Sequence, residues 1–595
     1  MKTPFPSNLA FAALVFPISL AAQMSVQIDP PTQPPQPLGT PVTWAAAVSG
    51  ADSGPLAYRF RIRRIGGDYR TIVDYGPKPV FTWTTLEKEG MYEIEVSVVN
   101  RDTREKATTT GMFTLTTLVT GDSPVVTPTV NPLVFIYSAP PCEAGGRMRV
   151  EFEMAAGGGM QSTPYESCTP GSSMNFYLAG MYADTAYVAH HVLDTGSAFV
   201  NGPAMSFAST DAGMQPPGAA ALTTGDPPAT QGILLQSLFA GPSVATDLTG
   251  NIIWYTPADI SYLTRPSGGG KFLAIGEYGT EDQSQQFVRE FDLAGITQAE
   301  TNAAQINQQL PSFGVQPINS FHHEARKLPD GSYLVMANSE RILTNVQGPG
   351  PVDVIGDTIL VLDSNLQVTW AWDAFDHLDP FRMAILGESC AYPAGLACAP
   401  FYLSSKANDW LHGNALDLAP DGNILYSARH QDWLIKIDYE NGAGTGDILW
   451  RLGNAGDFQI NSSDPNPWFS HQHDAHFEPS GTVIDLFDNG NSRLLVEPNP
   501  LSRGQVLQID EAKRTATLLL NANMGVLSVA VGSAQRLPSG NYHFDAGFIP
   551  DANGDGINTA QSVEVNSSGA IVFGIHFNTS EYRSFRMKDL YTAVP

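Results

Sequence analysis

The run HQHDAH at residues 471–476 places three imidazoles and one carboxylate within six positions. Imidazole binds metal ions, attacks electrophiles and transfers protons near neutral pH, so this spacing suits a metal site or a reaction centre. It also suits an exposed strand whose histidines have no joint role. The choice depends on the elements that carry the run.

The sequence around this run repeats, and the repeat predicts the fold. Each copy reads as a strand, a P-[DS]-G turn and a second strand. The copies are HEARKLPDGSYLVMAN (323–338), NALDLAPDGNILYSAR (414–429), HDAHFEPSGTVIDLFD (473–488) and GSAQRLPSGNYHFDAG (532–547). A third strand and usually a fourth follow each pair, which gives four strands per unit. Units that bury their faces only against neighbours are typical of β-propellers.

We therefore predict an all-β chain in which residues 228–595 form a six-bladed β-propeller. Two more degenerate copies, VATDLTGNIIWYT and FLAIGEYG with QFVREFDLAGITQAET, bring the expected number of blades to six. The last strands near SFRMKDLY are expected to return and close the ring.

Superposition of the repeats aligns four positions at the start of a strand, namely His323, Asn414, His473 and Gly532. Equivalent positions of successive blades converge on the propeller axis, so we expect His323 and His473 to lie in one ring. His412 precedes Asn414 by two residues, just as His471 precedes His473, and the role of His471 stays open. Several histidines at one point of the repeat favour a functional site over simple capping of strand ends.

Strand alternation separates the other members of HQHDAH. His476 lies three positions and Asp474 one position after His473, so both side chains are expected to point away from it. We interpret His476 as structural.

Two arginines stand beside the repeat positions. Arg429 lies in YSARHQDW, and Arg493 lies in DNGNSR after the His473 strand pair. A guanidinium group presents a planar fork of donors, which suits an oxyanion ligand. A surface or structural role is the alternative for each.

The segments before residue 228 predict an export signal and two further β-sandwiches. Residues 1–22 carry one Lys, an apolar stretch and a small-residue end, which is typical of a secretory signal peptide rather than a membrane anchor. Residues 23–120 alternate in short strands and predict an immunoglobulin-like sandwich, and residues 121–227 form a second β-rich block. We expect an exported protein, periplasmic or secreted, with no membrane span after signal removal.

Charge and cysteine content constrain partners and compartment. The chain has 32 Lys and Arg against 59 Asp and Glu, a formal charge of −27, which opposes nucleic-acid binding. In an oxidising compartment the four cysteines predict the local disulfides Cys142–Cys168 and Cys390–Cys398, with free buried thiols as the alternative.

The stretch DANGDGIN (551–558) resembles the start of a calcium loop. Asp551, Asn553 and Asp555 have the required spacing, but Ser562 stands where the bidentate Glu is expected. A structural calcium ion and a plain acidic turn both stay open.

These motifs resemble those of the bacterial arylsulfotransferases. The matching stretches are HHEARKLPDGSYLV, NDWLHGNALDLAPDGNILYSARHQ and QHDAHFEPSGTVIDLFDNGNSR, and the second sandwich is similar to the one that precedes the propeller in that family. The likeness covers about residues 125–590. It implies a six-bladed propeller that moves a sulfuryl group from an aryl sulfate to a phenol, without nucleotide sulfate and with no cofactor required.

The resemblance also implies residue roles. The nucleophile of the family's Gln-His motif maps onto His473, which would form a sulfohistidine intermediate in ping-pong kinetics. We expect as catalytic residues His473, His323, His412 and Arg429, with substrate contacts from Asn414 and Arg493.

Two departures from the family pattern leave acceptor range and activity open. Asp474 stands where the well-known members carry Thr, and the Cys390/Cys398 pair precedes His412, whereas the family's disulfide follows the Arg motif.

Two other functions remain in competition. A metal-binding propeller would hold zinc or copper through His471 and His473 with His323 or His412, although a neighbouring Arg opposes a cation. A non-catalytic exported propeller would serve binding or adhesion. The physiological donor and acceptor stay open, as does a homo-oligomer.

Overall fold

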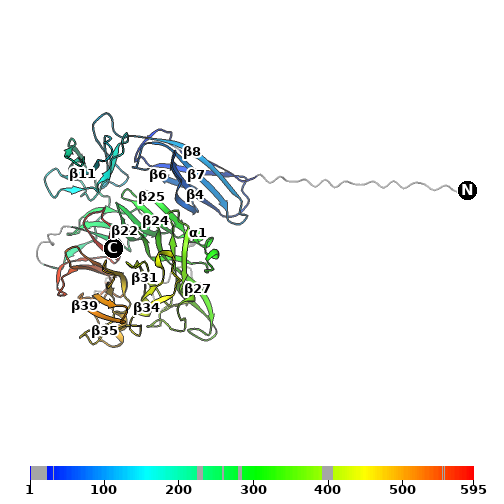
Figure 1. Ribbon diagram of the computed structural model, residues 1–595, viewed down its shortest axis with the longest axis vertical. Coiled ribbons are helices and arrows are strands. Elements are labelled where there is room, and N and C mark those ends of the chain that lie inside the picture. Colours follow the sequence, from blue (N-terminus) through cyan, green and yellow to red (C-terminus); the bar gives the residue numbers. More distant parts are fainter. Residues whose placement is uncertain are drawn as a thin grey trace.

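The computed structural model is built almost entirely of β-strands (Figure 1). It describes residues 1, 23–30, 32–223, 232–257, 260–278, 285–391, 406–551, 554 and 556–594. The expected signal peptide falls outside the described residues from position 2 to 22. In the described part of the chain, no helix has the length and apolarity that crossing a membrane requires.

The first strands form two sheets around a shared core. One sheet has the order β1–β3–β6, and the other contains β2–β8–β7–β4–β5. Exposed and buried residues alternate along SVQID in β1, which places one face against the core of Trp44, Phe60 and Trp83. The bounds are β1 (Ser25–Asp29), β2 (Gln36–Pro37), β3 (Val42–Ser49), β4 (Leu56–Arg64), β5 (Arg70–Gly76), β6 (Val80–Trp83), β7 (Gly90–Asn100) and β8 (Lys106–Thr116).

The next strands form two smaller sheets, with the orders β14–β10–β9 and β12–β11–β15–β16. The predicted disulfide Cys142–Cys168 is confirmed beside their common core. The second predicted disulfide, Cys390–Cys398, cannot be traced because Cys398 lies outside the described residues. The bounds are β9 (Val125–Pro128), β10 (Phe135–Ala139), β11 (Arg147–Met154), β12 (Gln161–Ser162), β13 (Glu166–Ser167), β14 (Met174–Leu178), β15 (Ala186–Asp194), β16 (Phe199–Asn201) and β17 (Met205–Ala208).

The rest of the described chain forms six antiparallel sets of four main strands, and three of these sets carry one additional strand. The first contains β44 (Glu581–Met587), β19 (Ile233–Leu238), β20 (Val244–Asp247) and β21 (Ile252–Tyr255). The second contains β22 (Ile260–Gly268), β23 (Lys271–Gly276), β24 (Phe287–Asp292) and β25 (Thr297–Asn302). The third contains β26 (Ser320–Lys327), β27 (Tyr333–Thr344), β28 (Pro351–Leu362) and β29 (Val368–Asp373), with β30 (Asn408–Asp409) on β28.

The remaining three sheets follow the same plan. The fourth contains β31 (Gly413–Leu418), β32 (Ile424–Ala428), β33 (Trp433–Ile437) and β34 (Ile448–Gly453). The fifth contains β36 (His473–Phe477), β37 (Val483–Asp488), β38 (Arg503–Asp510) and β39 (Thr515–Asn523), with β35 (Gln459–Asn461) on β39. The sixth contains β40 (Ser533–Arg536), β41 (Tyr542–Ile549), β42 (Thr559–Val565) and β43 (Ile571–Phe577), with β18 (Ala219–Ala221) on β43.

Short helices occupy a few of the connections. They are α1 (Ala303–Asn307), η2 (Leu310–Phe313), η3 (Ala374–Asp376), η4 (Arg429–Gln431), η5 (Glu440–Gly442) and η6 (Asn491–Leu495). The turn glycines of the sequence repeat lie between the first and second strands of four sheets. All have positive φ, between 69° and 88°, which favours glycine: Gly331, Gly422, Gly481 and Gly540.

The first strands of the six sheets contact one another in cyclic order. β22 contacts β26, β26 contacts β31, β31 contacts β36, β36 contacts β40, and β40 contacts β44. The last strand, β44, pairs with β19, which in turn contacts β22. The expectation that the final strands return to the start of the repeat is therefore confirmed. β18 lies before the expected boundary at residue 228, yet it pairs with β43.

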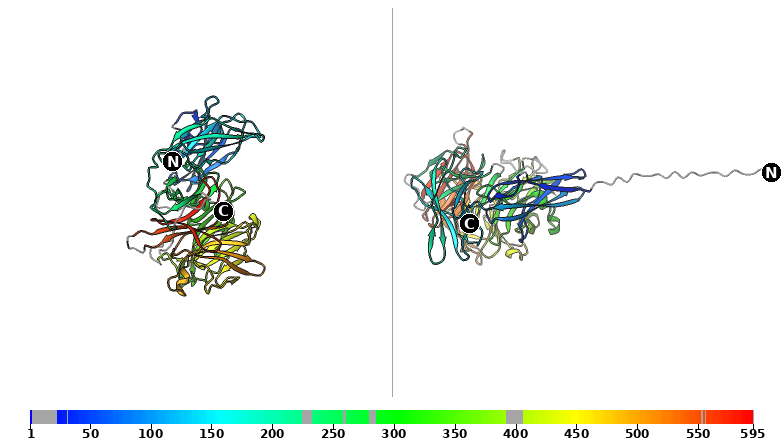
Figure 2. Two further views of the ribbon diagram at one scale, coloured as in Figure 1. Left: turned by 90° about the vertical axis from the view of Figure 1, so that its left-hand side faces the viewer. Right: turned by 90° about the horizontal axis from the view of Figure 1, so that it is seen from above.

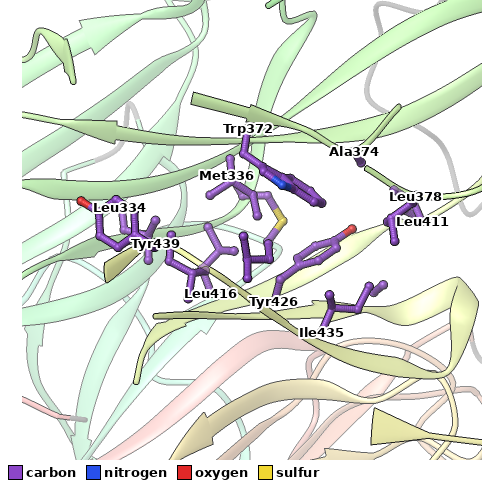
Figure 3. Close-up of a cluster of buried hydrophobic side chains, with 14 of the residues drawn as sticks. Leu334, Met336, Trp372, Ala374, Leu378, Leu411, Leu416, Tyr426, Ile435 and Tyr439 are labelled. Atoms are coloured by element: carbon purple, nitrogen blue, oxygen red, sulfur yellow. The ribbon is translucent and has the colours of Figure 1, made fainter. Parts of the chain in front are cut away.

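Neighbouring sheets bury their faces against each other. Between the third and fourth sheets, Met336, Trp372, Leu416 and Tyr426 form one apolar cluster (Figure 3). Strands β1–β17 lie at one end of the molecule and the later sheets at the other (Figure 2). β25 and β5 pair in parallel at that junction, which joins the second sheet to the N-terminal strands.

Four buried charged side chains meet between the first strands. Arg265 on β22 lies 3.1 Å from Glu324 on β26 and 2.5 Å from Asp474 on β36. Arg583 on β44 lies 3.0 Å from Glu324 and 3.7 Å from Asp474. Burial raises the pKa of both carboxyl groups, but the two arginines outweigh it and lower each pKa below its ordinary value. We call these four residues the central ion network.

The central ion network also reaches the two remaining sheets. Arg583 donates to the carbonyl of Asn414 on β31 over 2.7 Å. The carboxylate of Asp474 accepts from the backbone N–H of Ala534 on β40 over 3.2 Å. One network therefore contacts the first strand of every one of the six sheets.

We predict that Glu324→Gln destabilises the protein severely. The substitution keeps the shape of the side chain but leaves two buried arginines with one fewer counter-charge, and breaking a buried ion pair costs about 3–5 kcal/mol. Guanidinium unfolding followed by tryptophan fluorescence measures the loss. The matched control is Glu87→Gln, an exposed carboxylate that pairs with Arg70, and we expect a change within about 0.5 kcal/mol. Equal effects of the two substitutions would contradict this role.

Candidate functional site

A cavity of about 790 Å³ lies where the first strands of the six sheets begin, and residues in or beside each sheet line it. Six histidines contribute to the lining: His322, His323, His412, His430, His471 and His473. Arg429 lines the cavity as well. The sequence repeat thus brings together His323, His412, Arg429 and His473 from three different sheets.

The imidazole rings form a connected group. The ring centroids of His323 and His412 are 4.9 Å apart, and those of His323 and His473 are 6.4 Å apart. His412 stacks on His430 at 4.6 Å. At these distances neighbouring rings contact one another directly, and together they line the cavity.

Three of these histidines have a strained backbone. His323, His412 and His471 have φ values of 55°, 50° and 52°, in the left-handed region that non-glycine residues rarely adopt. Two tyrosines hold His323 in place: its N–H donates to the Tyr262 hydroxyl over 2.7 Å, and the Tyr582 hydroxyl donates to its carbonyl over 2.8 Å. With His323 in this conformation, the consecutive side chains of His322 and His323 both line the cavity.

The hydrogen bonds of His473 define its tautomer. Both N–H groups of the Asn489 amide donate to backbone carbonyls, so its Oδ1 faces His473 Nδ1 at 2.6 Å and accepts a hydrogen bond from the Nδ1–H group. The backbone N–H of Val531 donates to His473 Nε2 over 3.2 Å. Nδ1 therefore carries the proton, and Nε2 has the lone pair.

Burial also keeps this imidazole neutral. Burial, followed by the charge of Arg429, lowers the pKa of His473 well below its ordinary value. A neutral imidazole whose Nε2 lone pair borders a cavity is suited to nucleophilic attack.

Arg429 is a buried cation at the end of β32. Its Nη1 donates to His430 Nε2 over 2.6 Å and its Nη2 donates to the Val529 carbonyl over 3.1 Å. Among the described residues its Nε finds no hydrogen-bond partner. Since buried donors are normally paired, this geometry suits an oxyanion ligand.

His412 forms a dyad with a carboxylate. Its Nδ1 lies 2.7 Å from Asp409 Oδ2, on the short strand β30 that precedes it. The carboxylate orients the ring and leaves Nε2 for the cavity, an arrangement suited to general acid–base work.

His471 is held between two carboxylates. Its Nδ1 lies 2.9 Å from Asp432 and its Nε2 lies 2.5 Å from Glu388. Burial and the charge of Arg429 lower the pKa of His471, but its hydrogen bonds to the two carboxylates outweigh them and raise it above the ordinary value. A protonated His471 adds a second cation to the side of the cavity that carries Arg429.

The two predicted substrate-binding residues do not line the cavity. Asn414 is fully buried, and its amide donates to the carbonyl of Gln472 over 2.7 Å, which positions the chain just before His473. Arg493 pairs with Asp488 and donates to the Leu501 carbonyl over 2.5 Å. The cavity lining therefore does not support the expected substrate contacts of these two residues: in this geometry Asn414 and Arg493 support the backbone through the hydrogen bonds they donate to the carbonyls of Gln472 and Leu501.

The other members of HQHDAH lie as strand alternation suggests. His476 Nε2 is 3.3 Å from Asp485, and Asp474 belongs to the central ion network. Neither lines the cavity. A β-bulge, with Asp474 at φ 50°, lies between His473 and His476.

Several site residues were missed by the sequence analysis. His322 directly precedes His323, and His430 directly follows Arg429. Strict strand alternation would point the side chains of His322 and His430 away from the cavity. The left-handed φ of His323 and the helical turn η4 defeat that rule. The HH and RH pairs themselves were the available signal. Tyr582 and Asn489 sit outside the aligned positions, so the repeat gave no hint of them.

Two groups in the cavity have metal-ligand spacing: Glu388, His430 and His471, and Asp409, His412 and His430, with candidate ligand atoms within 4.8 Å of one another. Both groups need His430, whose Nδ1 donates to the Asp409 carbonyl and whose Nε2 accepts from Arg429. A metal ion would have to displace one of these bonds beside a buried cation. His473 belongs to neither group, so the ligand set expected from the sequence is not assembled.

The proposed calcium loop is only partly visible. The Asp551 carboxylate accepts from the N–H groups of Gly554 and Gly556, at 2.7 and 2.6 Å. The other two candidate ligands, Asn553 and Asp555, lie outside the described residues, so calcium stays a prediction.

Comparison with known proteins identifies the family. A family model described as arylsulfotransferase (ASST) matches residues 218–586, more than half of the chain. The chain belongs to the arylsulfotransferase family. The resemblance seen in the sequence motifs is confirmed, and membership supports aryl sulfotransferase activity, with aryl compounds as substrates.

Comparisons of this arylsulfotransferase with curated proteins and with solved structures add no further information about its function. None of the curated proteins matches. Among solved structures, the FN1-FN3 domains of chicken CNTN1 are 9% identical, with 32% of this chain and 68% of that chain covered and a TM-score of 0.14. A segment of two fibronectin type-III domains from chicken tenascin is 17% identical, with 31% and 98% covered and a TM-score of 0.14. Scores this low carry no argument about function.

We predict that Arg429→Lys weakens the binding of inorganic sulfate at least about tenfold, measured by isothermal titration calorimetry. Lysine keeps the charge but loses the planar fork, and a charge-assisted hydrogen bond is worth about 1.5–3 kcal/mol. The control is Arg451→Lys, at a partly exposed arginine outside the cavity. Unchanged sulfate affinity in Arg429→Lys would remove Arg429 from the anion site.

Proposed function

We propose that this arylsulfotransferase moves a sulfuryl group from an aryl sulfate to a phenol through a covalent sulfohistidine on His473. The observation that carries the proposal is the fixed tautomer of His473, because Asn489 retains the proton on Nδ1 and leaves the Nε2 lone pair at the cavity. We also propose that the six sheets are the blades of a six-bladed propeller. The cyclic contacts of their first strands support this.

In the first half-reaction, Nε2 of His473 attacks the sulfur of the aryl sulfate. The N–S bond forms, the bond between sulfur and the aryl oxygen breaks, and the phenolate leaves with the bonding electrons. Arg429 binds the sulfuryl oxygens, and His323 lies beside the reacting ring, with its centroid 6.4 Å from that of His473. The weak bond from the Val531 N–H to Nε2 yields to the sulfur.

The dyad of His412 and Asp409 handles the proton. Protonated at Nε2, His412 gives its proton to the departing phenolate. In the second half-reaction the neutral His412 takes the proton of an acceptor phenol, whose oxygen attacks sulfur and releases His473. One group serves as acid and then as base, as ping-pong transfer requires.

The proposal extends to the compartment of the protein and to its substrates. We propose an exported protein, periplasmic or secreted, acting on small phenols and their sulfate esters without a required cofactor. The disulfide Cys142–Cys168 supports an oxidising compartment. A homo-oligomer stays a prediction.

The direct test is intact mass spectrometry of the protein mixed with an aryl sulfate and no acceptor. We expect a gain of one sulfuryl group, localised by peptide mapping to His473, and its loss in His473→Asn. The matched control is His576→Asn on β43, outside the cavity, which should form the adduct at the wild-type level.

Undiminished transfer by His473→Asn would contradict the proposal. If the wild type formed no adduct and kept stoichiometric zinc or copper after dialysis, the metal-binding function would be favoured instead.

We predict an unusual pH profile for release of the donor phenol. The attacking imidazole must be neutral, and a group with a lowered pKa is neutral at all pH values above that pKa. The rate should therefore show no loss from His473 protonation between about pH 8 and about pH 6.5, a range in which an ordinary histidine becomes about half protonated.

Asn489→Asp should shift this profile. A carboxylate at Nδ1 stabilises the imidazolium and raises the pKa of His473, so the acid limb moves up toward neutral pH. The control is Asn523→Asp, on an exposed residue of β39. A wild-type acid limb centred near pH 6.5, unmoved by Asn489→Asp, would show that His473 is not the group that attacks.

A further inference from the structure

The cavity has an apolar mouth that transfer to a single-ring phenol leaves unused. Phe239, Leu386, Leu494, Leu495 and Phe548 all line it, and they come from four separate segments of the chain. Three of them are strongly exposed: Phe239 by 47%, Leu494 by 54% and Leu495 by 68%. Large apolar side chains gathered at the mouth of a cavity mark a surface that an apolar ligand covers.

Aromatic contacts run without a break from the reacting histidine to this mouth. The His473 and His323 ring centroids are 6.4 Å apart, those of His323 and Tyr582 are 5.7 Å apart, and those of Tyr582 and Phe239 are 6.5 Å apart. A substrate whose sulfur reaches Nε2 of His473 can thus extend along Tyr582 and end beside Phe239.

The turn that carries Leu494 and Leu495 is anchored by Arg493. Both leucines belong to η6, and Arg493 within that turn pairs with the buried Asp488 and donates to the Leu501 carbonyl. The turn is therefore fixed with Leu494 and Leu495 exposed, although exposure of apolar surface is unfavourable in the free protein. Arg493 acts here as a positioning residue.

Charge is confined to the inner part of the cavity. Arg429 and His471 supply the cations there, and the carboxylates that line it are Asp357, Glu388 and Asp409. The mouth residues Phe239, Leu494 and Leu495 carry no charge, and the chain has a formal charge of −27. A substrate whose single sulfate group lies in the charged inner part, with an uncharged remainder in the mouth, fits this arrangement. The negative charge of the chain would repel a second anionic group at the mouth.

The volume points to a substrate larger than one ring. In ping-pong transfer the donor phenol leaves before the acceptor enters, so the cavity holds one aryl group at a time. Cavities of roughly 300–1,000 Å³ hold drug-sized ligands. The present cavity, at about 790 Å³, is far larger than a single phenol needs.

We propose that the substrates are multi-ring phenols and their sulfate esters, uncharged apart from the reacting group, whose far ring lies between Phe239 and Leu495. This inference rests on the proposed function, and Phe239 and Leu495 would set specificity without touching the reacting atoms.

The test compares phenyl sulfate with 4-biphenylyl sulfate, titrated by calorimetry into His473→Asn, which binds the esters without turning them over. Burial of a second ring should make the biphenylyl ester bind at least about tenfold more tightly. Adding Phe239→Ala or Leu495→Ala should weaken the biphenylyl ester at least about fivefold and change phenyl sulfate less than about twofold. The matched control is Phe199→Ala, 68% exposed on β16 and outside the cavity, which should change neither.

Equal affinities of the two esters, or equal losses for both in Phe239→Ala, would overturn the inference. The proposed function is decided separately, by the adduct on His473 in the wild type. Absence of that adduct together with tenfold tighter binding of the biphenylyl ester would refute the transfer mechanism and keep the multi-ring ligand.

Discussion

The structure depends on the central ion network, in which Arg265 and Arg583 share Glu324 and Asp474. Removing four charges from water is expensive, and only close pairing with further hydrogen bonds offsets that cost. Those further bonds run to the first strands of the remaining two sheets, so the network fixes all six sheets relative to one another. Hydrophobic packing between neighbouring sheets contributes to stability, but it does not fix the positions of the six first strands around their common centre.

The network also sets the geometry of the reaction. Glu324 directly follows His323, and Asp474 directly follows His473. Anchoring the two carboxylates to the same pair of arginines fixes the backbone on which both imidazoles stand. Asn489 then selects the tautomer. Asp474, where the well-known family members carry Thr, is thus explained as part of this network rather than as a participant in sulfuryl transfer.

The repeat predicts which residues converge at its own homologous positions, and it carries no information about site residues outside those positions. His323, His412 and His473 converge because homologous strand starts meet in one place, and Arg429 ends the strand paired with one of them. Arg493 also follows a strand pair of the repeat, but its guanidinium group forms an ion pair with Asp488, five residues earlier. Tyr582 reaches the site because the last strand returns to the first sheet, and Glu388 comes from a segment outside the repeat. Such contacts depend on tertiary pairing, which spacing alone does not encode.

The central claim is that Nε2 of His473 accepts the sulfuryl group while Asn489 retains the proton on Nδ1. A crystal structure of the protein exposed to an aryl sulfate without acceptor tests it most directly. The account predicts tetrahedral density bonded to Nε2 of His473, with oxygens toward Arg429 and the contact between Nδ1 and Asn489 intact. Sulfur bonded to Nδ1 or to another histidine, or a metal ion held by the cavity histidines in its place, would contradict it.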